Sequence, residues 1–297
     1  MRNPAVVCFG EVLWDILPTG KIAGGAPMNV AFHANQLGLQ TQMISRVGND
    51  ENGRELLAFL NDKGVSVQFV QTDPVYPTGV VNVVLDEKGS PGYDIVQPAA
   101  WDFIHLSDDL SDAVKASDAF VFGSLSCRNE HSRRTLFELL NVAALRVFDV
   151  NLRPPFFSKD LLEALLYESN VVKMNDEELI LISGFWGGGN EERAQMEFVK
   201  EKFKLASVIV TKGPHGAALL NDDGFYLQKG FKVTVQDTIG SGDAFLGAFL
   251  SRALTGSPAQ ECLEFACAAG AFVATKKGAT PVYSLADLKE GLNILPG

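Results

Sequence analysis

The sequence predicts an α/β fold: a doubly wound, mainly parallel sheet flanked by helices, with a small β-sheet lid. Short apolar runs alternate along the chain with segments of helical periodicity, as they do where crossover helices join parallel strands. Several of these runs are almost continuously apolar, which is typical of strands buried on both faces. Two other segments break the alternation and have the pattern of hairpins, which predicts the second sheet.

The predicted strands of the main sheet are short runs rich in Val, Ile and Phe. They cover residues 5–9, 42–47, 118–122, 146–150, 170–173 and 208–211. Between them a helix is predicted to begin at Pro27, which fits an early helical position, and to end at Gly38. A second helix is predicted over residues 53–63.

A third helix has several start signals in the stretch Ser257-Pro258-Ala259-Gln260. Ser257 would be the N-cap, Pro258 the first helical residue and Gln260 the partner in a capping box. This helix is predicted to end near Gly278.

The lid is predicted from two segments, about residues 12–22 and 78–98. The second of them carries alternating and β-branched residues and a turn at 86–89. In an alternative interpretation these strands only extend the edge of the main sheet. No internal repeat or linker interrupts the chain, so residues 1–297 are predicted to form a single domain.

Composition excludes several classes of partner. The chain of 297 residues is 46% hydrophobic and 21% charged, as is usual for a globular protein. Its formal net charge of −11 argues against nucleic acid and anionic membranes, because both need a basic face. No targeting segment and no run of about 18 apolar residues is found, so a cytoplasmic protein is expected.

The cysteines and histidines do not have the spacing of a metal site. The cysteines contain no Cys-x-x-Cys pair and are predicted to be reduced and mostly buried; they are Cys8, Cys127, Cys262 and Cys267. The histidines are assigned no metal; they are His33, His105, His131 and His215.

A glycine-rich turn before an apolar helical run is the most informative motif. Gly240, Ser241, Gly242 and Asp243 lead directly into that run. Backbone N–H groups can converge in such a turn, and the helix dipole adds positive charge, so a phosphate is the expected ligand. A carboxylate there needs a function of its own, and Asp243 is predicted to accept a proton from a hydroxyl that attacks the phosphate.

The turn resembles the C-terminal signature of the ribokinase-like (PfkB) carbohydrate kinases, and other motifs of that family follow its order. They are Gly24-Gly25-Ala26-Pro27-Met28-Asn29, Asp149-Val150-Asn151-Leu152-Arg153, Asn175-Asp176-Glu177-Glu178 and Thr211-Lys212-Gly213-Pro214-His215-Gly216. The similarity covers the whole chain. Residues 9–18 are most similar to the fructokinase branch.

The resemblance implies roles at the phosphate and nucleotide end of the site. It implies that the 240–242 amides hold the transferring phosphate, and that Asn175 and Glu178 organise Mg²⁺ and the phosphates, with Glu178 acting through water. In a structural alternative, Asn175 and Glu178 only form a helix capping box. The residues implied in ATP binding are Thr211, Lys212, Gly213 and Gly216.

At the sugar end, the family positions that match Asp15, Gly24, Gly25 and Asn29 bind the sugar. A carboxylate can accept from two hydroxyls at once, an Asn side chain both donates and accepts, and glycines allow close approach. Arg153 is expected to steady a phosphate or a substrate oxygen; in an alternative interpretation it is a surface arginine before Pro154-Pro155. Trp101 is interpreted as packing, with closure of the pocket by Trp101 and residues 93–97 as the alternative.

The resemblance also implies a K⁺ ion held by Asp237 and a turn at 275–279, which would order the phosphate-binding turn. In the contrary interpretation, Lys276 or Lys277 pairs with Asp237 and replaces the ion. A homodimer through the lid is expected by analogy alone.

The predicted activity is ATP- and Mg²⁺-dependent phosphorylation of a free sugar, with fructose as the first choice. Ribokinase, 2-keto-3-deoxygluconate kinase and nucleoside kinase are the alternatives within the enzyme class. A catalytically inactive sugar-binding regulator is the alternative of another class, and the intact Asp243 argues against it.

Overall fold

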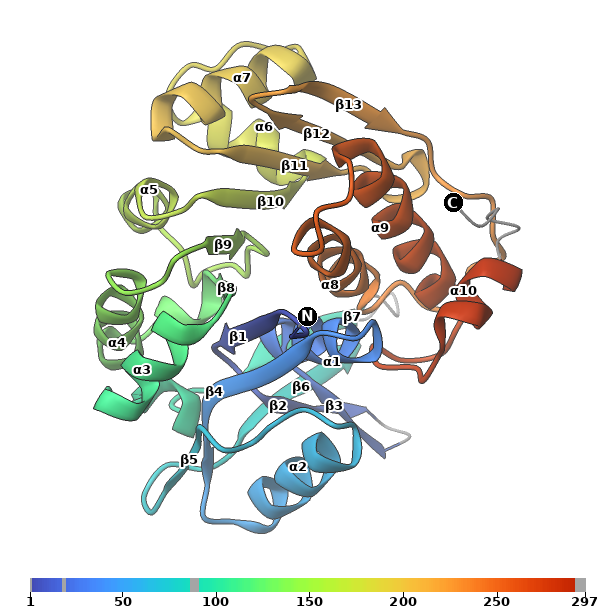
Figure 1. Ribbon diagram of the computed structural model, residues 1–297. Helices are drawn as coiled ribbons and strands as arrows, with labels where there is room; N and C mark the ends of the chain where they lie inside the picture. The colour runs from blue at the N-terminus through green and yellow to red at the C-terminus, as the bar shows by residue number, and fades with distance from the viewer. Residues whose placement is uncertain (1, 18–19, 86–90, 292–297) are drawn as a thin grey trace.

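The computed structural model describes residues 2–17, 20–85 and 91–291, so the predicted turn at 86–89 lies outside the described residues. Within them the main sheet has nine strands in the order β13-β12-β11-β10-β9-β8-β1-β4-β5 (Figure 1). Its strands are β1 (Ala5–Phe9), β4 (Gln40–Gly48), β5 (Val70–Asp73), β8 (Ala119–Gly123), β9 (Arg146–Asp149), β10 (Val171–Asn175), β11 (Ser207–Thr211), β12 (Ala217–Asn221) and β13 (Gly224–Gln228).

The predicted α/β fold is confirmed, and the sheet is parallel from β11 across to β5. Strands β12 and β13 continue it at one edge, each antiparallel to the strand before it. These two strands and β5 were not among the predicted ones. The first strand of the chain, β1, lies inside the sheet between β8 and β4.

Two hydrophobic cores lie on the two faces of this sheet, and successive strand residues alternate between them. In β1, Val6 and Cys8 belong to one core, whereas Val7 and Phe9 belong to the other. This alternation explains the continuous apolar runs, because a parallel strand covered by helices on both faces has no polar side.

Helices cover both faces. The first core packs under α1 (Ala26–Gln36), α2 (Glu51–Asp62), α8 (Ser241–Ala253), α9 (Ala259–Ala274) and α10 (Leu285–Gly291). The second core packs under α3 (Asp108–Ala116), α4 (Glu130–Leu140), α5 (Lys159–Tyr167), α6 (Asp176–Gly184) and α7 (Glu192–Phe203). No helix among the described residues is long and apolar enough to cross a bilayer.

The start of the third predicted helix differs from the prediction. Pro258 is the N-cap of α9 and the helix begins at Ala259, without a side-chain cap. Gln260 forms no capping box, because its amide donates to Leu227 O at 3.4 Å. The helix ends at Ala274, which leaves residues 275–278 as a turn.

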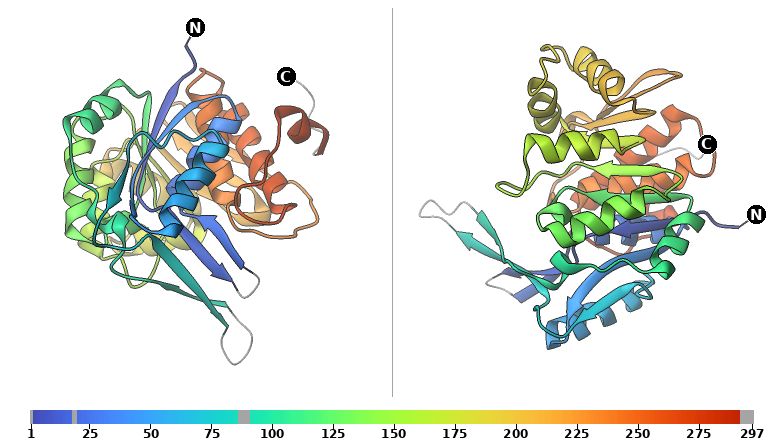
Figure 2. Two further views of the ribbon diagram at one scale, coloured as in Figure 1. Left: turned by 90° about the horizontal axis from the view of Figure 1, so that it is seen from below. Right: turned by 90° about the vertical axis from the view of Figure 1, so that its left-hand side faces the viewer.

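A separate four-stranded sheet is formed by the segments predicted as the lid. Its order is β3-β2-β6-β7, with β2 (Leu13–Leu17), β3 (Gly20–Gly24), β6 (Gly79–Leu85) and β7 (Pro91–Ile95). The two hairpins are antiparallel, and β2 pairs with β6 in parallel. The interpretation as an extension of the main sheet is therefore wrong. Figure 2 shows this small sheet projecting from the body of the protein.

The base of the small sheet is fixed by buried polar contacts. Arg128 forms an almost fully buried ion pair with Asp102, donates to the carbonyls of Ile95 and Val96, and lies over the Trp101 ring at 3.9 Å. Trp101 is fully buried, as its interpretation as packing requires.

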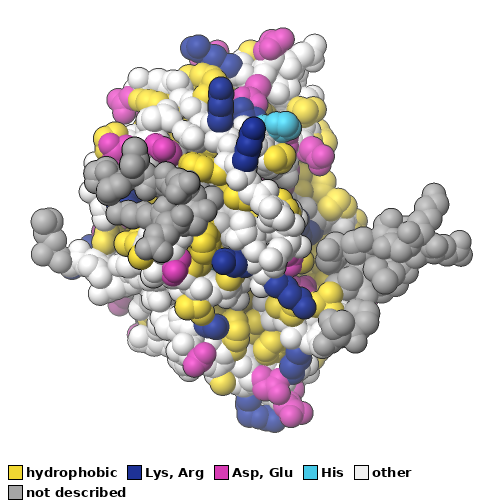
Figure 3. All heavy atoms as spheres, turned by 90° about the vertical axis from the view of Figure 1, so that its right-hand side faces the viewer, with side chains coloured by type: hydrophobic (Ala, Val, Ile, Leu, Met, Phe, Trp, Pro, Cys, Tyr) yellow, Lys and Arg dark blue, Asp and Glu magenta, His cyan; other side chains and the backbone are white. Residues whose placement is uncertain are grey.

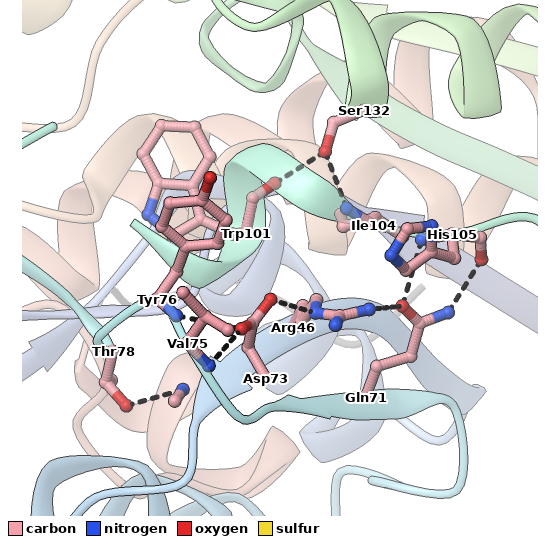
Figure 4. A network of polar contacts seen from close by, with 11 residues as sticks. Arg46, Gln71, Asp73, Val75, Tyr76, Thr78, Trp101, Ile104, His105 and Ser132 are labelled. Atoms are coloured by element: carbon pink, nitrogen blue, oxygen red, sulfur yellow. Dashed lines mark hydrogen bonds and ion pairs between the residues drawn. The ribbon is translucent and has the colours of Figure 1, made fainter. Parts of the chain in front are cut away.

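On the other side of Trp101, the connection from β5 to β6 is held to the main sheet. Arg46 pairs with Asp73 at 2.7 Å, and Asp73 also accepts from the amides of Val75 and Tyr76 (Figure 4). Thr78 accepts from the amide of Gly48 at 2.9 Å. The segment that leads into the small sheet is thus fixed at its start.

Candidate active site

The predicted phosphate-binding turn forms the N-terminus of α8. Gly240 is its N-cap with a left-handed φ of 78°, and a Cβ at that position would lie 2.6 Å from Ala279 O. Only glycine satisfies both conditions. Ser241 N–H donates to Thr238 O at 3.2 Å, and the first intrahelical bond runs from Ala244 N to Gly240 O.

This pattern changes which amides can serve a phosphate. The predicted donors were Gly240, Ser241 and Gly242, but the Ser241 N–H is used inside the turn. The amides of Gly242 and Asp243 precede the first intrahelical bond and are the free donors of the helix end. The Lys173 ammonium adds charge there, because a Cβ on Gly242 would lie 3.1 Å from Lys173 Nζ.

Asp243 and Asn29 are brought together from opposite ends of the chain. Asn29 Nδ2 donates to Asp243 Oδ2 at 2.8 Å. The pKa of Asp243 is raised to about 6, first by burial and then by the negative charge of Asp149, against the lowering effects of Lys173 and the Asn29 bond. A helix N-terminus alone would lower this pKa, so desolvation outweighs the dipole here.

Lys173 and Asp149 form a buried ion pair beside Asp243, with Nζ 2.9 Å from Asp149 Oδ1. Sequence analysis missed Lys173 as a site residue. The available signal was a lysine within an apolar strand that is buried on both faces, since such a charge needs a partner.

The glycine pair of the N-terminal signature allows two close approaches. A Cβ on Gly24 would lie 2.5 Å from Asp15 Oδ2, and one on Gly25 would lie 2.3 Å from Glu11 O. Gly25 also has a φ of 119°. Burial raises the pKa of Asp15 to about 6, and the charge of Arg153 opposes this shift.

Glu11 is a second residue that sequence analysis missed. Its side chain is buried, its Oε2 has no partner, and burial raises its pKa to about 7. The Arg153 charge acts on the pKa of Glu11, Asp15 and Asp243 alike, so these groups surround one region. Arg153 itself is exposed, with a bond to Leu152 O.

Asn29 also has an unpartnered buried atom, Oδ1. Unsatisfied buried polar atoms are uncommon in native structures and are usually explained by water or a ligand. The orphaned oxygens of Asn29 and Glu11, beside the charge of Arg153, fit a ligand that is rich in hydroxyl groups.

Asn175 and Glu178 form the capping box that the structural alternative describes. Asn175 Oδ1 accepts from Glu178 N at 2.8 Å, and Glu178 Oε2 accepts from Asn175 N at 2.8 Å. Glu178 Oε1 accepts from Leu152 N at 2.7 Å, which ties the box to the loop of Arg153. The box does not exclude a metal role, since each carboxylate oxygen keeps a free lone pair for a water molecule.

A magnesium ion fits this donor set only as a partner of substrate phosphates. Mg²⁺ keeps several waters and typically takes one or two protein carboxylates besides phosphate oxygens. Among the described residues no group of three or more His, Cys, Asp or Glu side chains is arranged to hold a metal. Glu178 is the carboxylate that would hold the ion through water.

The predicted nucleotide residues lie at the end of β11. Lys212 N donates to Gly216 O at 2.8 Å, and the Lys212 ammonium pairs with Glu192 at 2.9 Å. Gly216 has a φ of 94°, and a Cβ there would lie 2.0 Å from Gln228 O. Thr211 is the last residue of β11 and Gly213 lies within the turn, so the four residues lie close together.

Asp237 is linked to the turn that follows α9. Its carboxylate accepts from Gly278 N at 3.1 Å and from Ile239 N at 3.0 Å. No ion pair to Lys276 or Lys277 is found in the described part of the chain, and Lys276 lies over the Phe272 ring. The carboxylate oxygens keep lone pairs, so the arrangement fits a monovalent cation.

The face shown in Figure 3 bears side chains of both charges among the described residues. Lys and Arg side chains are spread over this face in small groups, with acidic side chains between them (Figure 3). The four cysteines are free and buried, as predicted.

The comparison with protein families decides the class. The model for the pfkB family of carbohydrate kinases matches residues 8–285. The chain belongs to this family. As a pfkB-family member, it is a carbohydrate kinase, and the resemblance seen in the sequence motifs is confirmed.

Several relatives of this pfkB kinase are fructokinases. Fructokinase-1 of Zea mays is 32% identical over an alignment of 308 residues that covers 93% of this chain and 93% of that one. The fructokinase of Vibrio cholerae O395 was solved with fructose, ADP and calcium; it has a TM-score of 0.84 at 27% identity, over 97% of this chain and 99% of that one. A double mutant of it was solved with fructose, ADP and potassium. The fructokinase of Xylella fastidiosa with bound ATP also has a TM-score of 0.84, at 25% identity over 98% and 99% of the chains.

Proposed function

We propose that this kinase transfers the γ-phosphate of ATP to a hydroxyl of free fructose, with Asp243 as the general base. One observation carries the assignment of the base: Asp243 is partly buried at a helix N-terminus, bonded to Asn29, with its pKa raised to about 6. A base with a pKa near the working pH is effective and still mostly ionised. The choice of fructose is supported by the motif at 9–18 and by the named relatives.

In the proposed reaction, Asp15 and Asn29 hold the sugar, with Gly24 and Gly25 allowing its close approach. Asp243 accepts the proton of the attacking hydroxyl, the new oxygen–phosphorus bond forms in line, and the bond between the β- and γ-phosphates breaks to release ADP. The amides of Gly242 and Asp243 and the Lys173 ammonium stabilise the transferring group. When bound, Mg²⁺ neutralises phosphate charge, with Glu178 and Asn175 on its side of the site.

We further propose that residues 1–297 act as one kinase domain and that the small sheet closes over the sugar. Closure would exclude water, so that ATP is not hydrolysed in place of transfer. A homodimer through this sheet and a cytoplasmic location stay predictions of the sequence. Sedimentation of the purified protein and fractionation of cells test them.

The substrate is tested by ADP release with Mg-ATP and a panel of acceptors: fructose, ribose, 2-keto-3-deoxygluconate, glucose, fructose 1-phosphate and adenosine. We expect the highest kcat/KM with fructose. A preference of about tenfold or more for ribose, 2-keto-3-deoxygluconate or adenosine would contradict the fructokinase assignment and favour the corresponding alternative. Sugar binding without turnover would favour the inactive regulator.

A potassium ion beside Asp237 is part of the proposal. It would fix the loop so that the helix-end amides point at the phosphate before it arrives, which is electrostatic preorganisation. The two N–H bonds to the Asp237 carboxylate and the potassium in a relative's structure support it. We expect kcat to be higher in K⁺ than in Na⁺ or tetramethylammonium at equal ionic strength, and equal rates would remove the ion from the mechanism.

A further inference from the structure

The helix that carries Asn29 also carries a fully buried histidine that the proposed mechanism does not use. His33 lies one turn after Asn29 in α1, so the two side chains share a face of the helix. Its Nε2 is 2.9 Å from Ala279 O and its Nδ1 is 2.9 Å from the Tyr283 hydroxyl. The imidazole therefore joins the sugar-binding helix to the segment that follows α9.

The two partners fix the tautomer of His33. A carbonyl oxygen can only accept, so Nε2 carries the proton and donates it to Ala279 O. Nδ1 then has only a lone pair and accepts from the Tyr283 hydroxyl. Burial lowers the pKa of His33 to about 4, which keeps the ring neutral at physiological pH. His33 is a fixed link between two segments and not a proton carrier.

The far end of this link is one wall of the phosphate-binding turn. Ala279 packs so closely on Gly240 that a Cβ there would lie 2.6 Å from Ala279 O and 2.7 Å from its Cα. The neighbouring amide of Gly278 donates to Asp237 Oδ2. A displacement of Ala279 would therefore shift Gly240, the N-cap of α8.

His33 also touches α8 directly. A Cβ on Gly247 would lie 2.9 Å from His33 Cβ, and Gly247 lies one turn after Asp243. Asn29 with Asp243 and His33 with Gly247 are thus successive layers of one interface between α1 and α8. In the first layer Asn29 holds the proposed base, Asp243, and in the second His33 holds Ala279 beside the phosphate-binding turn.

We propose that His33 is a positioning residue for nucleotide binding. Its Nε2–H bond to Ala279 O holds residues 278–279 against Gly240, which keeps the amides of Gly242 and Asp243 directed at the nucleotide phosphates. The inference rests on the proposed function only in placing those phosphates at the N-terminus of α8.

Two isosteric substitutions separate the two hydrogen bonds of His33. In His33→Gln the amide nitrogen reaches the place of Nε2 and can still donate to Ala279 O. In His33→Asn the side chain ends at the place of Nδ1, so the bond to Ala279 is lost. We expect H33N to weaken MgADP affinity by about fivefold to tenfold, as one lost hydrogen bond predicts, and H33Q to stay within about twofold of the wild type.

Affinity is measured by calorimetric titration of MgADP and, separately, of fructose, well below the melting temperature of each variant. Fructose affinity should be unchanged in both variants, because Asn29 and Asp15 are intact. Tyr283→Phe keeps the Ala279 bond and should bind MgADP like the wild type. If H33N does not fold, His33→Met fills the same space without a donor and should show the same selective loss.

A purely structural role would lower the melting temperatures of H33Q and H33N without separating their MgADP affinities, and that result would overturn the proposal. So would wild-type MgADP affinity in H33N, or a parallel loss of fructose affinity. If the wild type binds MgADP but not fructose, the substrate assignment fails while the comparison of the variants still decides the role of His33.

Discussion

Asp243 owes its chemistry to four neighbours supplied by different elements. Asn29 on α1 donates to it, Lys173 on β10 lowers its pKa, and Asp149 on β9 raises it. The fourth neighbour, Gly242, comes directly before Asp243 in the first turn of α8 and has a free backbone N–H. The balance leaves a carboxylate with a pKa of about 6, which suits a base at neutral pH better than an exposed aspartate does.

Asp243→Asn keeps the shape of the side chain and removes the base. We expect kcat to fall by a factor of about 10² to 10⁴, with ADP and sugar affinities little changed. In the wild type, kcat/KM should fall as the pH decreases through about 6, because Asp243 acts in its ionised form. Steady-state rates from pH 5 to 9 measure both effects, and a variant that kept a third of the wild-type kcat would make Asp243 structural.

Asp15→Ala is the comparison for that variant, because it should raise the sugar KM far more than the ATP KM. Asp15 stands in strand β2 of the small sheet, and the proposed proton transfer does not involve it.

Asp149→Asn tests the electrostatic coupling around Asp243. Asp149 raises the pKa of Asp243, so its neutralisation should move the acidic limb of kcat/KM to lower pH. Asp108→Asn, an exposed change in the first turn of α3, is the matched control and should leave the profile in place. An unmoved limb in Asp149→Asn, with the protein folded, would show that another group sets the profile.

At the scale of elements, the contact between α1 and α8 is the part of the fold on which the site depends most. Both helices carry a site residue in one turn and a packing residue in the next, as Asn29 with His33 and Asp243 with Gly247. The glycine permits the close approach of the two helices, and the approach sets the distance between Asn29 and Asp243.

Gly247→Ala should separate these helices. The added methyl group would lie 2.9 Å from both Ala34 N and His33 Cβ, so the backbones must move apart. We expect a loss of about 1–3 kcal/mol in the free energy of unfolding, together with a lower kcat. Gly184→Ala in α6 is the control, because nothing lies within 4 Å of its Cβ position. Urea unfolding and kinetics would contradict the prediction if the two variants behaved alike.

At the scale of the whole molecule, the sequence predicted the layers of the fold and the turns that carry the motifs. The structure added the contacts between side chains that are far apart in the sequence, such as Lys173 with Asp149 and Asn29 with Asp243. Continuous apolar runs such as 118–122 identify buried strands because the requirement is local to the run. The Gly240–Asp243 turn was visible for the same reason. Lys173 and Glu11 were missed because their importance depends on what folds against them, which no local pattern contains.

Two misreadings have the same cause. Ser257 and Pro258 have the chemistry of a helix start, yet α9 begins one residue later, and Gln260 contacts β13. Strand β13 lies at an edge of the sheet, where burial is incomplete and the apolar pattern is weak. Strand β12 is almost fully buried, but its short run of Ala and Leu has no β-branched residue to indicate a strand. In both cases tertiary contacts, and not the local sequence pattern, determine the secondary structure.

Glu11 illustrates the stability cost of building this site. Its pKa is about 7 in the folded protein against an ordinary 4.5, so folding favours its protonated form. The stabilising effect of protonation is fully present below pH 4.5 and is lost as the pH rises through about 7. Glu11→Gln should therefore be more stable than the wild type at pH 8 by roughly 1–3 kcal/mol.

At pH 4.5 the two proteins should unfold alike, because Glu11 is then protonated in the folded state. Urea unfolding at the two pH values measures the difference. An equal gain at both would mean that packing, and not the buried charge, sets the effect.

The hydrogen bond between Asn29 and Asp243 joins residues 214 positions apart, and the bond between His33 and Tyr283 spans 250. During synthesis the amino-terminal helix α1 leaves the ribosome long before its partners exist. A nascent chain can thus form the base pocket only after Asp243 has been synthesised, and the wall of the phosphate turn only after Ala279 and Tyr283 have been synthesised. Loop closure over such distances is slow, so the face of α1 that packs on α8 stays uncovered during much of translation. We therefore expect a chaperone to bind that face of the nascent chain.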